Sequence, residues 1–95
     1  MGAFKGGEGL PTVIKLGAYT IFIWTNDHVP VHVHVHVCKG SPHENATKII
    51  VPADGSPYVE HNKDKIPNKD MKTILRWISQ NKGRIYLMWY RIHQD

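Results

Sequence analysis

One segment of this chain, residues 31–38, alternates strictly between two kinds of side chain. Valine occupies every odd position, and the even positions hold His32, His34, His36 and Cys38. Successive side chains of a β-strand point to opposite faces of a sheet, so this period of two predicts a strand. Its valine face is expected to pack on the core, so any catalytic or metal-binding residues of this strand are expected on the histidine face.

Other segments have the composition of strands. Residues 12–16 and 19–25 are rich in β-branched and aromatic side chains. Gly17-Ala18 between them has the length of a two-residue hairpin turn, because glycine readily adopts positive φ. The run 19–25 is apolar on both faces, which predicts the central strand of the sheet. Residues 47–51 form a further predicted strand, and Tyr58-Val59 could add an edge segment.

After residue 67 the apolar spacing becomes helical. Side chains recur at i, i+3, i+4 and i+7, and the pattern repeats in phase: Met71, Ile74, Leu75, Ile78, then Ile85, Met88, Trp89, Ile92. Asn68, which follows Pro67, is the candidate N-cap. Gly83 costs about 1 kcal/mol inside a helix. Because the stripe stays in phase across it, the prediction is one helix that continues or kinks slightly.

The predicted architecture is an α+β domain: a small twisted antiparallel sheet of three to five strands with the C-terminal helix packed on one face. Its 95 residues suffice for one core. Residues 1–10 contain four glycines and are expected to be a flexible leader, so that 11–95 form the single domain. Phe22 and Trp24 are expected to form core that the helix covers.

Composition also bears on location and partners. The sequence has no apolar run of about 20 residues and no apolar core of a signal peptide, so neither a membrane span nor export is expected. A single cysteine, Cys38, fits a reducing, cytoplasmic setting and is expected to be an unreactive small side chain. The net charge of +4 favours a polyanion or an acidic protein as partner, although a solvated surface explains it equally well. Exposed sheet edges make a homodimer conceivable.

Three stretches together resemble a known bacterial family. They are Pro11-Thr12-Val13, the aromatic run Phe22 to Asn26, and Pro30-Val31-His32-Val33-His34-Val35, followed by a C-terminal helix with Trp89 near its end. The chain resembles the family called domain of unknown function 4160 over roughly residues 11–92. His36 extends the usual histidine pair, and the loop 39–46 is longer than is typical of the family.

The resemblance implies a function by association only. Members of the family commonly occur beside a second small gene whose product looks like a DNA-binding antitoxin. The resemblance therefore implies a toxin-like component of a toxin–antitoxin-type module, with a small antitoxin-like protein as its partner. Small basic toxins of this kind are usually directed at RNA or at translation.

The histidine strand could hold a metal ion. Histidines two apart on a strand point the same way with Cα atoms about 6.5–7 Å apart, and their nitrogens can converge on one divalent ion such as zinc. His32, His34 and His36 are the candidate ligands, and one ion could use only a neighbouring pair of them. A third ligand would come from elsewhere, with these candidates: His28, His43, Glu44, Glu60 and His61.

The same pair could instead act without a metal. Imidazoles titrate near neutrality, so His32 and His34 could divide the acid and base roles of RNA cleavage, as in a ribonuclease. The phosphate would then need cations, for which the sequence offers these candidates: Lys63, Lys65, Lys69 and Arg76, with Arg84 as a further one.

A third interpretation gives the histidines no chemistry. They would supply the polar side of a half-exposed strand, because imidazole tolerates partial burial. The functional predictions are therefore a toxin-like protein acting on RNA or translation through His32 and His34, a non-catalytic module that binds a small partner protein, and a metal-binding protein.

Overall fold

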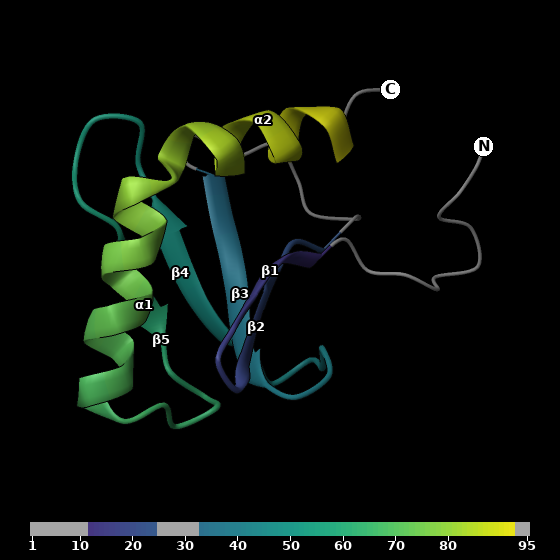
Figure 1. Ribbon diagram of the computed structural model, residues 1–95, viewed down its shortest axis with the longest axis vertical. Coiled ribbons are helices and arrows are strands. Elements are labelled where there is room, and N and C mark those ends of the chain that lie inside the picture. Colours follow the sequence, from purple (N-terminus) through teal and green to yellow (C-terminus); the bar gives the residue numbers. More distant parts are fainter. Residues whose placement is uncertain (1–11, 25–32, 93–95) are drawn as a thin grey trace.

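The computed structural model describes residues 12–24 and 33–92 of the chain (Figure 1). The described residues form five strands followed by two helices: β1 (Thr12–Leu16), β2 (Tyr19–Phe22), β3 (Val33–Lys39), β4 (Thr47–Val51), β5 (Tyr58–His61), α1 (Asn68–Gln80) and α2 (Lys82–Ile92). Every neighbouring pair of strands is antiparallel, and the sheet order follows the chain order from β1 to β5. The fold is α+β, as the sequence predicts.

The first two strands form the predicted hairpin. Leu16 lies opposite Tyr19, and Gly17 has a φ of +63°, a conformation that glycine adopts without steric cost. The central strand is β3, however, so the prediction that residues 19–25 hold this position is wrong. Both faces of β2 are nevertheless buried. Tyr19 and Ile21 pack in the core under the helices, and Phe22 packs on the opposite face with Cys38 and Ala46.

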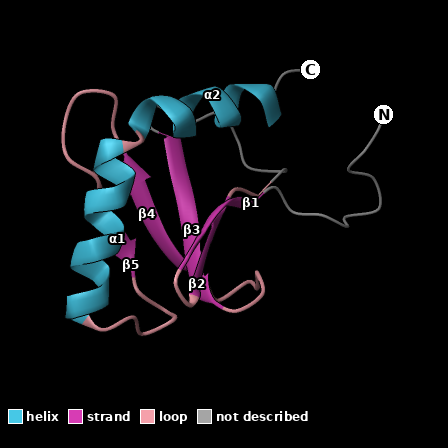
Figure 2. Ribbon diagram, in the orientation of Figure 1, coloured by secondary structure: helices cyan, strands magenta, loops and turns pink. Residues whose placement is uncertain are grey.

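One face of the sheet packs against the helices. The valines of β3 share a core with Ile49 and Val51 of β4 and with the apolar stripe of the helices. The buried members of that stripe are Met71, Ile74, Ile78, Ile85 and Trp89. Figure 1 shows α2 turned across the end of the sheet where β3 begins, and Figure 2 distinguishes the strands from the helices by colour. The predicted core face of the valines is therefore confirmed for Val33, Val35 and Val37.

The helical segment is interrupted, contrary to the prediction of one helix. Asn81 leaves helical geometry with φ −124° and ψ 28°, and its side-chain amide donates a hydrogen bond of 2.8 Å to the carbonyl of Trp77. Gly83 lies inside α2. The apolar stripe stays in phase because both helices bury it in one core, so the phase does not reveal an interruption of one residue. The N-cap is Pro67, and the predicted cap Asn68 is the first helical residue.

The loop before α1 is held by one asparagine side chain. Asn62 Oδ1 accepts hydrogen bonds from the Thr47 hydroxyl at 2.6 Å and from the Ile66 backbone N–H at 2.9 Å. Its Nδ2 donates to the Ile66 carbonyl at 2.9 Å. These contacts fix the loop to β4 and set the direction in which α1 begins. Among the described residues, neither helix is long and apolar enough to cross a membrane.

Trp89 tests the packing of α2 on the sheet. Its side chain is 1% exposed, so Trp89→Ala should lower the free energy of unfolding by about 3–5 kcal/mol through lost burial and a cavity. Urea denaturation measures the change. Leu87→Ala is the matched control, because Leu87 is on the same helix but 54% exposed, and its effect should stay within about 0.5 kcal/mol. Equal losses in the two variants would contradict the packing described here.

Candidate functional site

The face of the sheet opposite α1 carries a row of side chains that crosses four strands. His36 of β3 lies opposite Phe22 of β2 and opposite Lys48 of β4, and Lys48 in turn lies opposite His61 of β5. Directly opposed residues on one face of a sheet are in contact distance. The row therefore places an aromatic ring, two imidazoles and an ammonium group side by side. We call this surface the histidine face.

His34 and His36 are packed among aromatic rings. Each is only 8% exposed. The His36 ring stacks on Phe22 with centroids 5.6 Å apart and meets Trp24 edge-on at 5.8 Å. His34 lies 5.6 Å from His36 and 5.2 Å from Trp89 of α2, also between ring centroids. His34 and His36 are therefore buried and do not lie on a half-exposed face, as the third interpretation supposed, whereas its assignment of no chemistry to them stays a prediction.

Phe22 of β2 and Trp24, which follows that strand, lie on the other side of the sheet from their predicted position. Phe22 is fully buried with Cys38 and Ala46, and the half-buried Trp24 packs against this cluster. The helices cover the alternate residues of this segment, Ile21 and Ile23. The expectation that the helix covers Phe22 and Trp24 is thus wrong. Aromatic content predicted their burial but did not identify the buried face.

The predicted metal ligands are only partly described. His34 and His36 lie together, whereas His32 and the candidate His28 fall outside the described residues. His43 Nε2 lies 3.1 Å from Asp64 Oδ1. Within residues 12–24 and 33–92, no group of three or more His, Cys, Asp or Glu side chains is arranged to hold a metal ion. Metal binding stays a prediction that depends on His32.

The remaining candidate ligands lie at the edge of the sheet or in the loop after β3. Glu60 Oε2 lies 3.7 Å from Lys48 Nζ, and Glu44 is exposed in the loop between β3 and β4. His61 is separated from His36 by Lys48 in the row across the sheet. A bound ion at His36 would thus face an ammonium group on this side.

The pKa of His61 is shifted by its surroundings. Burial lowers its pKa, and the nearby positive charges of Lys63 and Lys48, together with His36, lower it further, while Glu60 raises it. Its Nδ1 atom is buried and makes no hydrogen bond with any of the residues that the structure describes. The imidazole is therefore neutral at pH 7. This could not be predicted from the sequence, because a register shift between Lys48 and Ile49 sets the position of His61 on the edge strand.

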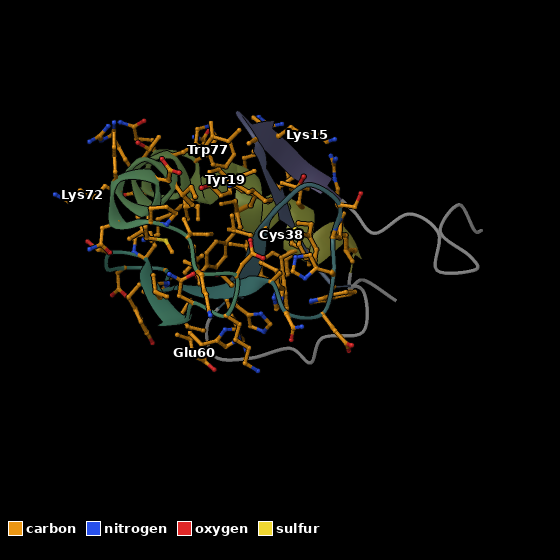
Figure 3. The ribbon with its side chains drawn as sticks, turned by 90° about the horizontal axis from the view of Figure 1, so that it is seen from below. Lys15, Tyr19, Cys38, Glu60, Lys72 and Trp77 are labelled. Carbon is orange, nitrogen blue, oxygen red and sulfur yellow. The ribbon has the colours of Figure 1, made fainter. Side chains whose placement is uncertain are left out.

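Of the predicted phosphate-binding residues, Lys63 lies near His61, whereas Lys69 and Arg76 lie on the other side of the sheet from the histidine face. Lys63 and Lys65 are exposed in the loop that Asn62 holds, and Lys69 and Arg76 are exposed on α1. Because α1 packs on the valine face, Lys69 and Arg76 are separated from His34 by the sheet. Lys72, which the prediction omitted, completes an exposed stripe with them at i, i+3 and i+7. Figure 3 shows Lys72 extending outward from α1.

The only acidic residue of the two described helices is Asp70, and it is engaged with the sheet. The Tyr19 hydroxyl donates a hydrogen bond of 2.5 Å to Asp70 Oδ2. This bond, together with burial, raises the pKa of Tyr19 to about 12. Tyr19 therefore stays protonated and ties β2 to α1 over the whole physiological pH range.

Cys38 behaves as a buried apolar side chain. Its thiol is 0% exposed and donates a hydrogen bond of 3.2 Å to the Ser41 carbonyl. Burial, and to a lesser degree the charge of Asp64, raises its pKa. A thiol held protonated is a poor nucleophile, which agrees with the prediction that Cys38 is unreactive.

The comparisons with known proteins give one match. The family model described as "Domain of unknown function (DUF4160)" matches residues 18–90, a range that contains β2 to β5, all of α1 and most of α2. No curated protein and no solved structure matches the chain.

His61 predicts a pH dependence of stability. Its pKa is lower in the folded state than in the unfolded chain, so the unfolded chain binds the proton more readily. The contribution of His61 to the free energy of unfolding should be fully present above about pH 6.5. It should decrease as the pH drops below that value, by less than about 1.4 kcal/mol per pH unit. Urea denaturation between pH 5 and 7.5 measures this slope.

Two variants attribute the slope to His61. His61→Gln removes the titrating group and should flatten the pH dependence. Tyr58→Phe, on the same strand, leaves every histidine in place and should retain the wild-type slope. An unchanged slope in His61→Gln would show that another group causes the loss.

Proposed function

The chain belongs to the domain of unknown function 4160 family, and we propose that it is the toxin-like component of a toxin–antitoxin-type module that acts by binding RNA through the outer surface of its helices. The main support for this proposal is the positive charge of the helices. Helices α1 and α2 hold six cations (Lys69, Lys72, Arg76, Lys82, Arg84 and Arg91) and one acid, Asp70. Such a surface attracts a polyanion.

The cations of α1 are placed to contact a phosphate backbone. Lys69, Lys72 and Arg76 are exposed on one side of the helix, and the stripe from Lys69 to Arg76 is about 10 Å long at 1.5 Å per residue. Lys63 and Lys65 precede the helix in a loop with a fixed conformation, in which Lys65 has a φ of 56°. The partial positive charge of the α1 N-terminus adds to the attraction for phosphate at that end.

The burial of the histidines favours RNA binding over RNA cleavage as the function of the protein. A general acid or base must reach its proton within hydrogen-bond distance, and His34 is 8% exposed with its ring against His36 and Trp89. A strand of RNA along α1 would also lie across the sheet from the histidine face. Cleavage by His32 and His34 stays a prediction, because His32 falls outside the described residues.

The antitoxin-like partner is part of the same proposal and is supported by the family resemblance alone. An acidic partner that covered the helices would compete with RNA for the same cations, because opposite charges across an interface speed association and improve specificity. Inhibition by such a partner would then need no contact with the histidines.

Charge removal on α1 tests RNA binding. We expect a 12-nucleotide oligouridylate to bind the wild type, and we expect Lys69→Gln, Lys72→Gln and Arg76→Gln each to weaken binding. The logarithm of affinity should depend on the logarithm of salt concentration, and the slope should fall by about 0.7 for each phosphate contact removed. Fluorescence anisotropy at several salt concentrations measures both quantities.

Lys15→Gln is the matched control for this experiment. Lys15 is an exposed residue of β1 opposite Thr20, whose side chain is on the histidine side of the sheet, so the variant loses the same charge away from α1. Equal losses for Lys15→Gln and Lys72→Gln would show a non-local effect of net charge and contradict the proposed surface. If the wild type cleaved RNA and a folded His34→Ala variant did not, the activity would instead belong to the histidine strand.

A further inference from the structure

A cavity lies between the β1–β2 turn and α1. Its volume is about 410 Å³, within the range of small-molecule sites. The apolar part of its wall comes from Leu16, Ala18 and Ile74, and the polar part from Tyr19, Asp70 and Thr73. Gly17 of the turn also lines it, and space beside its Cα is open. The cavity is thus an apolar site with a few polar groups on the α1 side.

Asp70 supplies the main polar group of this cavity. A carboxylate offers about four lone-pair positions, and the Tyr19 hydroxyl occupies one of them on Oδ2. The bond to Tyr19 fixes the carboxylate in place, while its remaining positions can accept hydrogen bonds from a ligand. A ligand that fits must therefore present donors, and two adjacent donors match the two oxygens best.

The cavity borders the cationic stripe of α1. Thr73, which lines the cavity and is exposed, follows Lys72 directly and stands four residues after Lys69 and three before Arg76. Residues three and four apart are neighbours on a helix surface. A phosphate backbone held by these cations would therefore pass the cavity mouth.

We propose that the cavity takes up one unstacked base of a single-stranded RNA and prefers guanine. This inference rests on the proposed RNA binding and adds the base that the site selects. Proteins commonly read single-stranded RNA by inserting splayed bases and bonding their Watson–Crick edges. Leu16 and Ile74 would contact the base, and the Asp70 carboxylate would accept its donors.

The chemistry of the four base edges makes guanine the preferred ligand. Guanine presents N1–H and the N2 amino group side by side, which matches the two oxygens of Asp70. Uracil presents one N–H between two carbonyls, whose oxygens the carboxylate repels. Adenine and cytosine each present an amino group beside a ring nitrogen acceptor, so they can donate one bond. The expected order of affinity is guanine, then adenine and cytosine, then uracil.

The test compares 12-nucleotide oligouridylates that differ at one central position. Fluorescence anisotropy should show that a single central guanine tightens binding to the wild type about 5- to 10-fold relative to all-uridine RNA, a gain of the size expected for one good bidentate contact. Adenine or cytosine at that position should give a smaller gain. Equal affinity for all four RNAs would overturn the inference while leaving the proposed RNA binding intact.

Two variants assign the preference to the cavity. Thr73→Trp places a bulky ring at an exposed position of the wall, so the fold should survive, the guanine preference should be lost and affinity for all-uridine RNA should remain. Ser79→Trp adds the same ring elsewhere on α1 and should keep the preference. A preference that persists in Thr73→Trp would place base recognition outside this cavity. Asp70→Asn should also lose the guanine preference, and circular dichroism checks that this variant is folded.

Guanosine without phosphate separates this inference from the proposed function. Because it carries no charge for the stripe to bind, it reports on the cavity alone. Titration of the wild type should shift the amide NMR signals of Thr73 and Ile74, and uridine should shift them less. Such shifts without any RNA binding would support the cavity and count against the proposed function. Absence of shifts together with equal affinity for the four RNAs would reject the base site.

Discussion

The burial of β3 on both faces is the constraint on which the rest of the structure depends. Its valines pack under the helices, and its histidines pack among Phe22, Trp24 and Trp89. Full burial of an aliphatic or aromatic side chain contributes about 1.5–3 kcal/mol, so this strand and its neighbours supply much of the driving force for folding. Because both faces of the central strand are occupied, the exposed polar side chains of the described residues lie mainly on the edge strands, the loops and the outer side of the helices.

Burial changes what the histidines can do. An imidazole that stacks on Phe22 and meets a second imidazole edge-on has little room for a substrate. In the row across the sheet, the ammonium group of Lys48 lies between His36 and His61 and would oppose a cation bound there. The described part of the histidine face thus favours a packing role for His34 and His36.

The sequence predicted the elements better than their environment. The period of two in residues 31–38 and the Gly17-Ala18 turn follow from local geometry, and β3 and the hairpin formed as expected for the described residues. The interruption at Asn81 leaves the apolar phase intact and was not predictable from it. The burial of His34 and His36 depends on side chains of β2 and α2, and contacts between distant segments leave no signal in a single sequence. The same holds for Asp70, whose pairing with Tyr19 joins residues 51 positions apart.

The two faces of the sheet divide the possible functions between them. Helices α1 and α2 shield the valine face from water, and their outer side is free to carry cations because their inner side already supplies the packing. The one acid among those cations, Asp70, would weaken phosphate binding if it stood on the stripe. It is instead turned toward Tyr19 at the cavity wall, where a carboxylate can select a donor-rich ligand without opposing the backbone contacts. In the proposed binding mode, attraction of a polyanion and discrimination between its bases belong to adjacent residues of one helix. That assignment requires nothing from the histidine strand beyond its role in holding the helix in place.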